Sequence, residues 1–561
     1  MATDPPPAAA PAPSEGAGSS GATGSAEEAF RAPPPPPPTS ASIWPPPGAG
    51  SGTQYSRGNP RARAPRTVAD VGGLRPPVKE GDVVEGFLLE KLLHQGGMAS
   101  MWRVIRVDAE GRPAPLPEEP PLIMKVPRIK GGEDPASIVG YEVEQMIMPT
   151  LSGIHVPRFI ARGDFTRQPY IVMEHLPGDT LRPRLSEAPL AIDEVAEIGA
   201  RVSTALHDLH RQHVVHLDIK PSNIMFRPDG AAVLVDYGLS RHDFLPDLLE
   251  EDFSLPMGTG PYMSPEQVQF VRNDPRSDLF ALGVMLYHFT TGERPFGAPT
   301  SVRGLRKRLW MDPVPPRALR KDCPPWLQEV ILKCLEVHAD KRYQSAAQLA
   351  LDLQQPDQIT LTRRAERMAR SSQWTRFKRW FFALGAEAQE TAPAAGATEQ
   401  LRRSSIVMAA VDIDNAAPEL LEQLRETVRR IVITEPGARL ACVSVMRIAR
   451  IGTDLLTDDE GKSLYLKQLV ALKHWARPIS RSLDLEDGRL TFHVLEAPDP
   501  ATALVGFAQR NQVDHIVMGA RAASALRRYL GSVSSTVVAE SLCTVTVVRA
   551  SAPEGAERGE A

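Results

Sequence analysis

The pattern of apolar and polar positions divides the first half of the chain into a strand-rich part and a helical part. Short apolar stretches at 87–93, 101–107 and 122–126 predict strands. Further on, apolar residues recur every three or four positions within 191–210, which indicates an amphipathic helix. From about residue 83 to residue 353 we therefore expect a small sheet followed by a helical lobe.

Beyond Ser404 the pattern alternates regularly between apolar strands and helices. Such alternation predicts a mostly parallel sheet covered by helices, which is an α/β domain. The strands are expected at 405–411, 440–446, 490–496, 515–519 and 544–549, and the helices at 418–433, 464–475 and 501–509.

The remaining segments have compositions that do not favour a packed core. The N-terminal segment is rich in Pro, Ala and Gly, and its unbroken run Pro33–Pro38 is suited to a disordered tether or a polyproline ligand. Between the two domains, the basic and aromatic stretch 363–382 could dock on the neighbouring domain, lie on an anionic membrane surface or contact a partner. We favour docking. The expected organisation is a disordered tail at 1–80, a domain at 81–355, a basic aromatic linker at 356–402, a domain at 403–550 and a disordered tail at 551–561.

Bulk composition excludes several classes of protein. The chain has 561 residues and a net charge of -4, which argues against a general nucleic-acid binder. Its four cysteines show neither C-x-x-C spacing nor a nearby histidine cluster, so neither a disulfide framework nor a zinc site is predicted. The sequence has no signal-peptide pattern and no apolar run of about 18 residues. We expect a cytoplasmic protein without a transmembrane segment.

Three motifs in order carry the most specific chemistry: "HVVHLDIKPSNIMF" from His213, then "VLVDYG", then "GTGPYMSPE". Together they resemble the signature of eukaryotic-like Ser/Thr protein kinases in their bacterial form, over about residues 83–353. The resemblance implies a bilobal α+β kinase fold that transfers the γ-phosphoryl group of ATP to protein hydroxyls with Mg²⁺.

The resemblance also assigns roles to individual residues of these motifs and of the helical lobe. Asp218 would accept the proton of the substrate hydroxyl, and Lys220 would offset charge on the migrating phosphoryl group. Asn223 and Asp236 would hold Mg²⁺. Glu266 is expected to pair with Arg342, and Asp278 to brace the catalytic loop, as structural supports.

In the first lobe, "PLIMKV" makes Lys125 the candidate for contact with the α- and β-phosphates. Its ion-pair partner would be Glu142 or Glu144, and the spacing to Leu151 favours Glu144. "YIVMEHL" resembles the hinge, with Met173 as gatekeeper and with Glu174 and Leu176 beside the adenine.

Two departures from the family pattern change the expected mechanism. Leu217 stands where the family has an arginine that binds a phosphate group on the activation segment. We therefore predict activity that does not depend on phosphorylation of that segment, whose main hydroxyls are Ser240, Ser254 and Thr259.

The second departure is the stretch "LHQGGMASMW", in which the family's glycine loop has His94 and Ala99 at its outer positions. The central Gly96 is kept, so the backbone can still approach phosphates closely. Leu93, Gly96, Gly97 and Ala99 are expected to cover the nucleotide.

The C-terminal domain resembles the universal stress protein family over about residues 403–550. The resemblance rests on "IVMAAVD" and on "HIVMGARAASALRRYLGSVSS", and it implies a second nucleotide site with ATP or AMP at Asp412, Gly519, Gly531 and Ser532. Ala522 replaces a pattern glycine, and the spacing to Gly531 is one residue short, so an adaptor that binds no small molecule is slightly favoured. A homodimer through "TVTVVR" is a family-level expectation.

We therefore predict a multidomain protein: a protein kinase fold followed by a universal-stress-protein-like α/β domain with a parallel sheet, after a Pro-rich tail. The expected function is an ATP- and Mg²⁺-dependent Ser/Thr protein kinase with protein substrates, linked to stress signalling. The alternatives are a pseudokinase scaffold, a nucleotide-sensing adaptor without transferase activity, and a small-molecule kinase. Retention of Lys125, Asp218, Asn223 and Asp236 favours an enzyme, and "GTGPYMSPE" favours a protein substrate.

Overall fold

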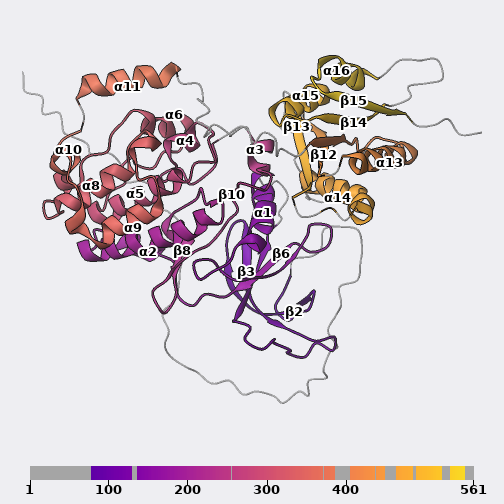
Figure 1. The fold of residues 1–561 in the computed structure, drawn as a ribbon. Coiled ribbons are helices and arrows are strands. Elements are labelled where there is room, and N and C mark those ends of the chain that lie inside the picture. Colours follow the sequence, from indigo (N-terminus) through magenta and orange to yellow (C-terminus); the bar gives the residue numbers. More distant parts are fainter. Residues whose placement is uncertain are drawn as a thin grey trace, which may run out of the picture. The chain divides into compact units, whose positions relative to one another are not determined.

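A computed structural model describes most of the two predicted domains (Figure 1). The predicted tails lie outside the described residues, except for 78–80, and so do 386–402 of the linker. The described ranges are 78–128, 135–253, 256–370, 372–385, 405–435, 437–448, 463–483, 485, 488–520 and 531–549.

The first domain begins with an antiparallel sheet in the order β1-β2-β3-β4-β6-β5. Burial alternates along β4, whose Leu122, Met124 and Val126 pack into the core on one side of the sheet. Lys125 therefore points to the other side, where Ile171 and the helix α1 (Pro135–Ile147) form a second core. The strands are β1 (Val83–Val84), β2 (Phe87–Gln95), β3 (Ala99–Arg106), β4 (Leu122–Pro127), β5 (Phe159–Gly163) and β6 (Tyr170–Glu174).

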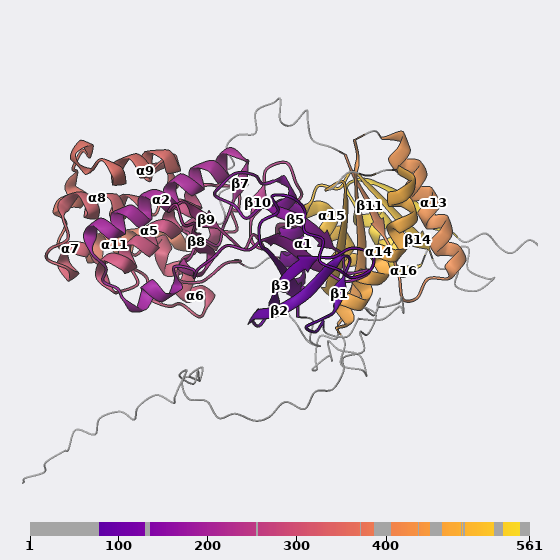
Figure 2. The same ribbon diagram turned by 90° about the horizontal axis from the view of Figure 1, so that it is seen from below.

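The helical lobe follows and is built around α5 (Arg276–Thr291), nearly all of whose residues are buried. The helix α2 (Ile192–Arg211) contacts both α5 and α9, and Figure 2 shows these helices side by side. The other helices are α3 (Leu248–Asp252), α4 (Pro265–Val268), α6 (Val302–Leu305), α7 (Pro316–Leu319), α8 (Pro325–Cys334), α9 (Ala346–Gln354) and α10 (Arg363–Glu366), and the short strands are β7 (Val214–Val215), β8 (Ile224–Phe226), β9 (Ala232–Leu234) and β10 (Arg241–His242). The predicted order of a sheet and then helices is confirmed.

The C-terminal domain has a sheet in the order β13-β12-β11-β14-β15, and all its strand pairs are parallel. Val407 of β11 packs with α13 and α14, whereas Met408 packs with α15 and α16, so helices cover both faces (Figure 1). The predicted α/β domain is confirmed. Its elements are β11 (Ile406–Ala410), α13 (Pro418–Thr434), β12 (Arg439–Arg447), α14 (Leu464–Leu483), β13 (Leu490–Ala497), α15 (Pro500–Arg510), β14 (His515–Ala520), α16 (Ser532–Glu540) and β15 (Thr544–Arg549).

The helix α14 is longer than predicted, because it passes Trp475 and continues through Pro478 to Leu483. A proline inside a helix removes one backbone donor and costs about 3 kcal/mol. The buried side chains of Trp475, Ala476 and Ile479 pack on α13 and the sheet and keep this stretch helical.

In the linker, the helix α11 (Gln373–Gly385) does not dock its aromatic face as expected. Trp374, Phe377 and Phe381 are 66%, 52% and 65% exposed, so the favoured interpretation was wrong. The helix is held by its opposite face, where Arg379 Nη1 lies 2.6 Å from Asp312 Oδ1. Among the described residues, no helix is long and apolar enough to cross a membrane.

Candidate active site

The carboxylate of Asp218 is the centre of a hydrogen-bond network in the loop between β7 and β8. Its Oδ2 accepts from Lys220 Nζ at 2.5 Å and from Asn223 Nδ2 at 3.1 Å. Its Oδ1 accepts from the hydroxyl of Thr259 at 2.7 Å and from the backbone N–H of Thr259 at 3.2 Å. Asp218 is only 6% exposed, and these four bonds compensate for its loss of hydration. The structure thus brings together four residues that the sequence singled out: Asp218, Lys220, Asn223 and Thr259.

The loop that carries Asp218 is fixed from below by Asp278, in the first turn of α5. The carboxylate of Asp278 accepts from the backbone N–H of His216 at 2.9 Å and from that of Leu217 at 2.8 Å. Nε2 of His210 lies 2.9 Å from the same carboxylate, which is fully buried. Leu217 has a φ of 62°, a strained left-handed conformation that these bonds maintain. The predicted bracing role of Asp278 is confirmed.

A second cluster lies across the lobes, around the ammonium of Lys125 on β4. Its Nζ lies 2.5 Å from Glu144 Oε2 on α1 and 3.0 Å from Asp236 Oδ1, which follows β9. Of the two candidates, Glu144 is the one that pairs with Lys125. Glu142, two positions earlier, points away from Lys125 and pairs instead with Lys473 of the C-terminal domain.

Burial and charge oppose each other in this cluster. Burial lowers the pKa of Lys125, but the charges of Asp236 and Glu144 outweigh it and raise that pKa above its ordinary value. Burial raises the pKa of Glu144, whereas the positive charge of Lys125 lowers the pKa of Asp236. Lys125 is therefore a permanent cation at neutral pH, placed where a polyphosphate could replace Asp236 as its partner.

The segment after β6 is anchored to both lobes. The backbone N–H of Glu174 donates to Arg158 O at 2.9 Å, and that of His175 donates to Pro121 O at 2.7 Å. The Glu174 carboxylate accepts from Arg227 Nη2 at 2.9 Å, and this hydrogen bond lowers the pKa of Glu174. Met173 of β6 and Leu176 of this segment are buried, with 8% and 6% of their surface exposed.

The loop between β2 and β3 folds back on itself. The N–H of Gly96 donates to Ala99 O at 2.9 Å, and Arg128 Nη1 donates to Gly96 O at 2.6 Å. A Cβ on Gly96 would lie 3.5 Å from His94 Nε2, whereas a Cβ on Gly97 would meet none of the described atoms within 4 Å. A side chain at position 96 would therefore contact neighbouring atoms of the loop, whereas a side chain at position 97 would have free space around it. Leu93 lies before it on β2, with 38% of its surface exposed.

Asn223 and Asp236 supply the oxygen donors that a hard divalent cation needs. The amide nitrogen of Asn223 donates to Asp218 O at 3.0 Å and to Asp218 Oδ2 at 3.1 Å, which turns its Oδ1 the other way. The Asp236 side chain is 47% exposed. In the described part of the chain, no three His, Cys, Asp or Glu residues form a metal cluster. This pair thus fits Mg²⁺, which commonly takes its other ligands from water and phosphate.

Below the site, the predicted pair between Glu266 and Arg342 is present. Two bonds of 2.6 and 2.8 Å join the guanidinium to the carboxylate, and Ser277 Oγ donates to Glu266 at 2.8 Å. The Arg342 side chain is fully buried. The pair connects α4 with the segment before α9 and is confirmed as a scaffold contact.

The predicted second nucleotide site is only partly described, because 521–530 lie outside the described residues. Asp412 follows β11 and accepts from Asn415 Nδ2 at 3.0 Å. A Cβ on Gly519 would lie 3.0 Å from Leu420 Cδ2, so the lack of a side chain at this position allows Leu420 of α13 to pack closely against β14. Gly531 precedes α16 and Ser532 begins it. Gly519 thus has a packing role that needs no nucleotide.

Contacts between the two domains were not predicted. Arg439 and His493 of the C-terminal sheet pair with Glu251 and Asp252 of α3. The acidic run "DLLEED" was the one visible signal, but its partners lie 188 and 241 positions away along the chain.

Comparisons with known proteins give a family match for each of the two domains. Residues 132–353 match the model of the protein kinase domain, and residues 404–549 match that of the universal stress protein family. Serine/threonine-protein kinase PknB of Mycolicibacterium smegmatis is 37% identical over 206 residues, which are 36% of this chain and 33% of that protein. PknB of Mycobacterium tuberculosis is 36% identical over 186 residues, 33% of this chain and 30% of that protein. The chain thus spans about a third of the length of these curated relatives.

Proposed function

We propose that this chain, in which a protein kinase domain precedes a universal stress protein domain, is an ATP- and Mg²⁺-dependent serine/threonine protein kinase. The observation that carries the proposal is the Lys125 bridge to Glu144 and Asp236, formed across the two lobes. In protein kinases this arrangement accompanies a site that is ready for phosphoryl transfer.

Each residue of the site has a role in this reaction. Asp218 accepts the proton of the substrate hydroxyl, Lys220 offsets charge on the transferred group, and Lys125 binds the α- and β-phosphates. Mg²⁺ held by Asn223 and Asp236 would neutralise phosphate charge. Leu93, Gly96, Gly97 and Ala99 would cover the nucleotide, and Glu174 and Leu176 would contact the adenine.

The hydrogen bonds of Asp218 add a requirement to this mechanism. A carboxylate has about four acceptor positions, and Lys220, Asn223 and the two groups of Thr259 occupy four. A substrate hydroxyl must therefore displace one donor. Lys220 is the best candidate, because its ammonium is drawn toward the phosphoryl group when ATP is bound.

The activation segment supports activity without phosphorylation. The Ser240 hydroxyl is buried and donates to His216 O at 3.1 Å, and that of Thr259 is bonded to Asp218. Ser254 lies outside the described residues. That kinase activity does not depend on phosphorylation of this segment stays a prediction. It is supported by Leu217, which stands in place of the family's phosphate-binding arginine.

The test is phosphate transfer by the full-length protein with labelled ATP and Mg²⁺, to itself and to a basic protein. We expect Asp218→Asn to abolish transfer while preserving the fold, since it removes the base but keeps the shape, and Lys125→Met to do the same by removing the phosphate contact. If the wild type transfers no more phosphate than Asp218→Asn does, the chain is a scaffold and the proposal fails.

The finer expectations about partners stay predictions: protein substrates in stress signalling, a homodimer through β15, and a cytoplasmic location. For 363–382, the exposed aromatic face of α11 supports contact with an anionic membrane surface. The neighbouring segment η4 (Arg306–Leu309), which contacts α11, adds the exposed cations Arg306 and Lys307.

A further inference from the structure

The helix α1 is held from two sides by two glutamates. Glu144 faces the lobe interior and pairs with Lys125, whereas Glu142 faces outward and pairs with Lys473 of α14. Residues two positions apart on a helix point in nearly opposite directions. The position of Glu144, on which the Lys125 bridge depends, is therefore linked to a cation of the C-terminal domain.

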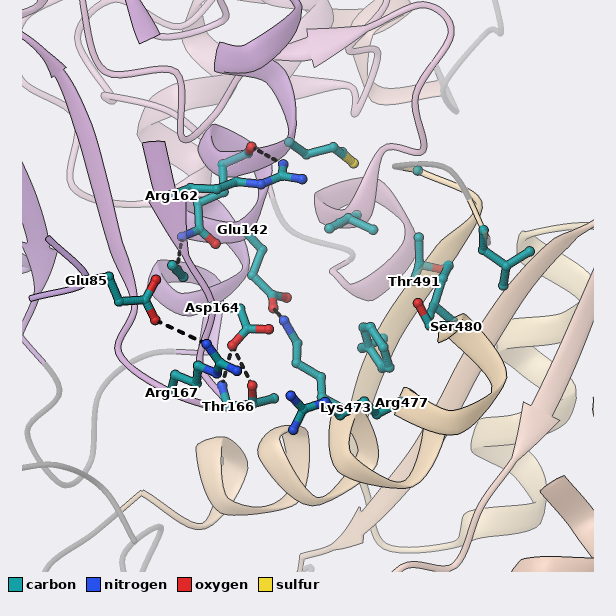
Figure 3. Close-up of a pocket in the computed structure, with 18 residues that line it drawn as sticks. Glu85, Glu142, Arg162, Asp164, Thr166, Arg167, Lys473, Arg477, Ser480 and Thr491 are labelled. Atoms are coloured by element: carbon teal, nitrogen blue, oxygen red, sulfur yellow. Dashed lines mark hydrogen bonds and ion pairs between the residues drawn. The ribbon is translucent and has the colours of Figure 1, made fainter. Parts of the chain in front are cut away.

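The contact made by Lys473 is well enclosed. Its ammonium also lies 5.6 Å from the ring centre of Phe165 and 5.2 Å from that of Phe492. The side chains of Lys473 and Glu142 are only 13% and 10% exposed. Figure 3 shows the pair among the residues that line a cavity of about 520 Å³, to which both domains contribute. A partly buried ion pair of this kind is costly to leave half-formed.

A second contact holds the activation segment. Arg439 Nη1 lies 2.6 Å from Glu251 Oε1 on α3, and His493 Nδ1 lies 2.7 Å from Asp252 Oδ1. The side chains of His493 and Asp252 are 0% and 4% exposed. The helix α3 also contacts α1, so the two contacts act on neighbouring elements.

Apolar packing supports the same arrangement. Tyr465, Leu466 and Leu469 of α14 and Val494 of β13 are buried in one core with residues of α1 and α3. The two domains belong to one compact unit of the chain. The charged contacts thus surround a shared apolar core rather than joining two exposed surfaces.

The charges explain how the segment is held without a phosphate. A phosphorylated segment needs an arginine in the catalytic loop, and Leu217 cannot serve. Here the segment supplies the carboxyl groups of Glu251 and Asp252, and the C-terminal domain supplies their partners, the guanidinium of Arg439 and the imidazole of His493. The groups that hold the segment thus lie in another domain.

We propose that Lys473, Arg439 and His493 are positioning residues for phosphoryl transfer, which hold α1 and α3 so that Lys125 and Glu144 stay paired. The inference rests on the proposed kinase function and assigns its regulation: any event that displaces the C-terminal domain from α1 and α3 lowers kinase activity. The stress-protein domain is then an activator within the same chain.

The test is a charge exchange in the full-length protein. Lys473→Glu and Glu142→Lys are each expected to lower kcat for peptide phosphorylation at least about tenfold, because each places like charges together at α1. The double variant restores the pair with reversed charges, and its activity is expected to return to within about threefold of the wild type. Lys467→Glu, at an exposed position of the same helix, is the matched control.

Hydrogen exchange gives a second readout that needs no catalysis. In each single variant the amides of α1 and α3 are expected to exchange faster, with those of α5 and β11 unchanged, and the double variant should reverse the effect. Arg439→Gln tests the α3 contact alone and should speed exchange mainly in 248–252.

Two results would overturn the inference: single variants that match Lys467→Glu in both activity and exchange, or a double variant no better than the single ones. Failure of the kinase proposal looks different. In that case the wild type equals Asp218→Asn in phosphate transfer, while the exchange pattern still reports whether the C-terminal domain holds α1 and α3.

Discussion

The hydroxyl of Thr259 offers the sharpest test of the site, because it joins the activation segment to the proton acceptor. It donates to Asp218 Oδ1 at 2.7 Å and accepts from Lys220 Nζ at 3.0 Å. Thr259→Val keeps the shape of the side chain and removes both bonds. Hydrogen bonds to charged groups contribute about 1.5–3 kcal/mol each, so the loss of one in the transition state corresponds to about 10- to 150-fold in rate.

We expect a value near the lower end of that range, because the backbone N–H of Thr259 still donates to Asp218 at 3.2 Å. The assay is the initial rate of peptide phosphorylation at varied peptide and ATP concentrations. The value of kcat/KM for peptide should fall about 10- to 30-fold, while KM for ATP should change less than about twofold, since Thr259 orients Asp218 and does not hold the nucleotide.

Thr259→Ser is the matched control, because it keeps the hydroxyl and loses one methyl group. It should stay within about threefold of the wild type. The reasoning is refuted if Thr259→Val is as active as Thr259→Ser, or if both variants are equally impaired. The second result would indicate that the methyl group and its packing, rather than the hydroxyl, maintain the segment.

Two further predictions concern stability and surface contact. Arg342→Ala leaves the carboxylate of Glu266 buried without its partner and should lower the free energy of unfolding by about 3–5 kcal/mol, measured by urea denaturation followed by circular dichroism; a change below about 1 kcal/mol would contradict the buried pair. Replacing Trp374 and Phe377 together with alanine should reduce sedimentation of the protein with vesicles that contain phosphatidylserine, but not its kinase activity. Equal sedimentation of the variant and the wild type would exclude α11 as the contact.

Local features of the site could be predicted from the sequence because motif and geometry lie close together along the chain. The loop that carries Asp218 and Asn223 is eight residues long, from His216 to Asn223, and its internal bonds follow from its own order of residues. The parallel sheet was likewise predictable, since each strand carries its own apolar pattern. Such features need little information from distant parts of the chain.

The errors arose where packing between distant elements decides the structure. Nothing near Pro478 indicates that α14 continues through it, because the side chains that hold it helical pack on α13. The aromatic face of α11 gives the same pattern whether it is buried or exposed, and in the structure the opposite face is the one that makes a contact, through Arg379 and Asp312. Helical periodicity shows that a helix has two faces, but not which face is covered.

Glu142 and Glu144 show how one helix can serve two domains. Both are acidic and both are close to the expected spacing, so the sequence could favour Glu144 but could assign nothing to Glu142. In the structure the second glutamate pairs with Lys473, and α1 is thereby connected to the phosphate-binding lysine on one side and to the C-terminal domain on the other. A helix that must rotate to break one pair strains the other, because the two side chains share a rigid backbone. The two ion pairs are therefore expected to form and break together.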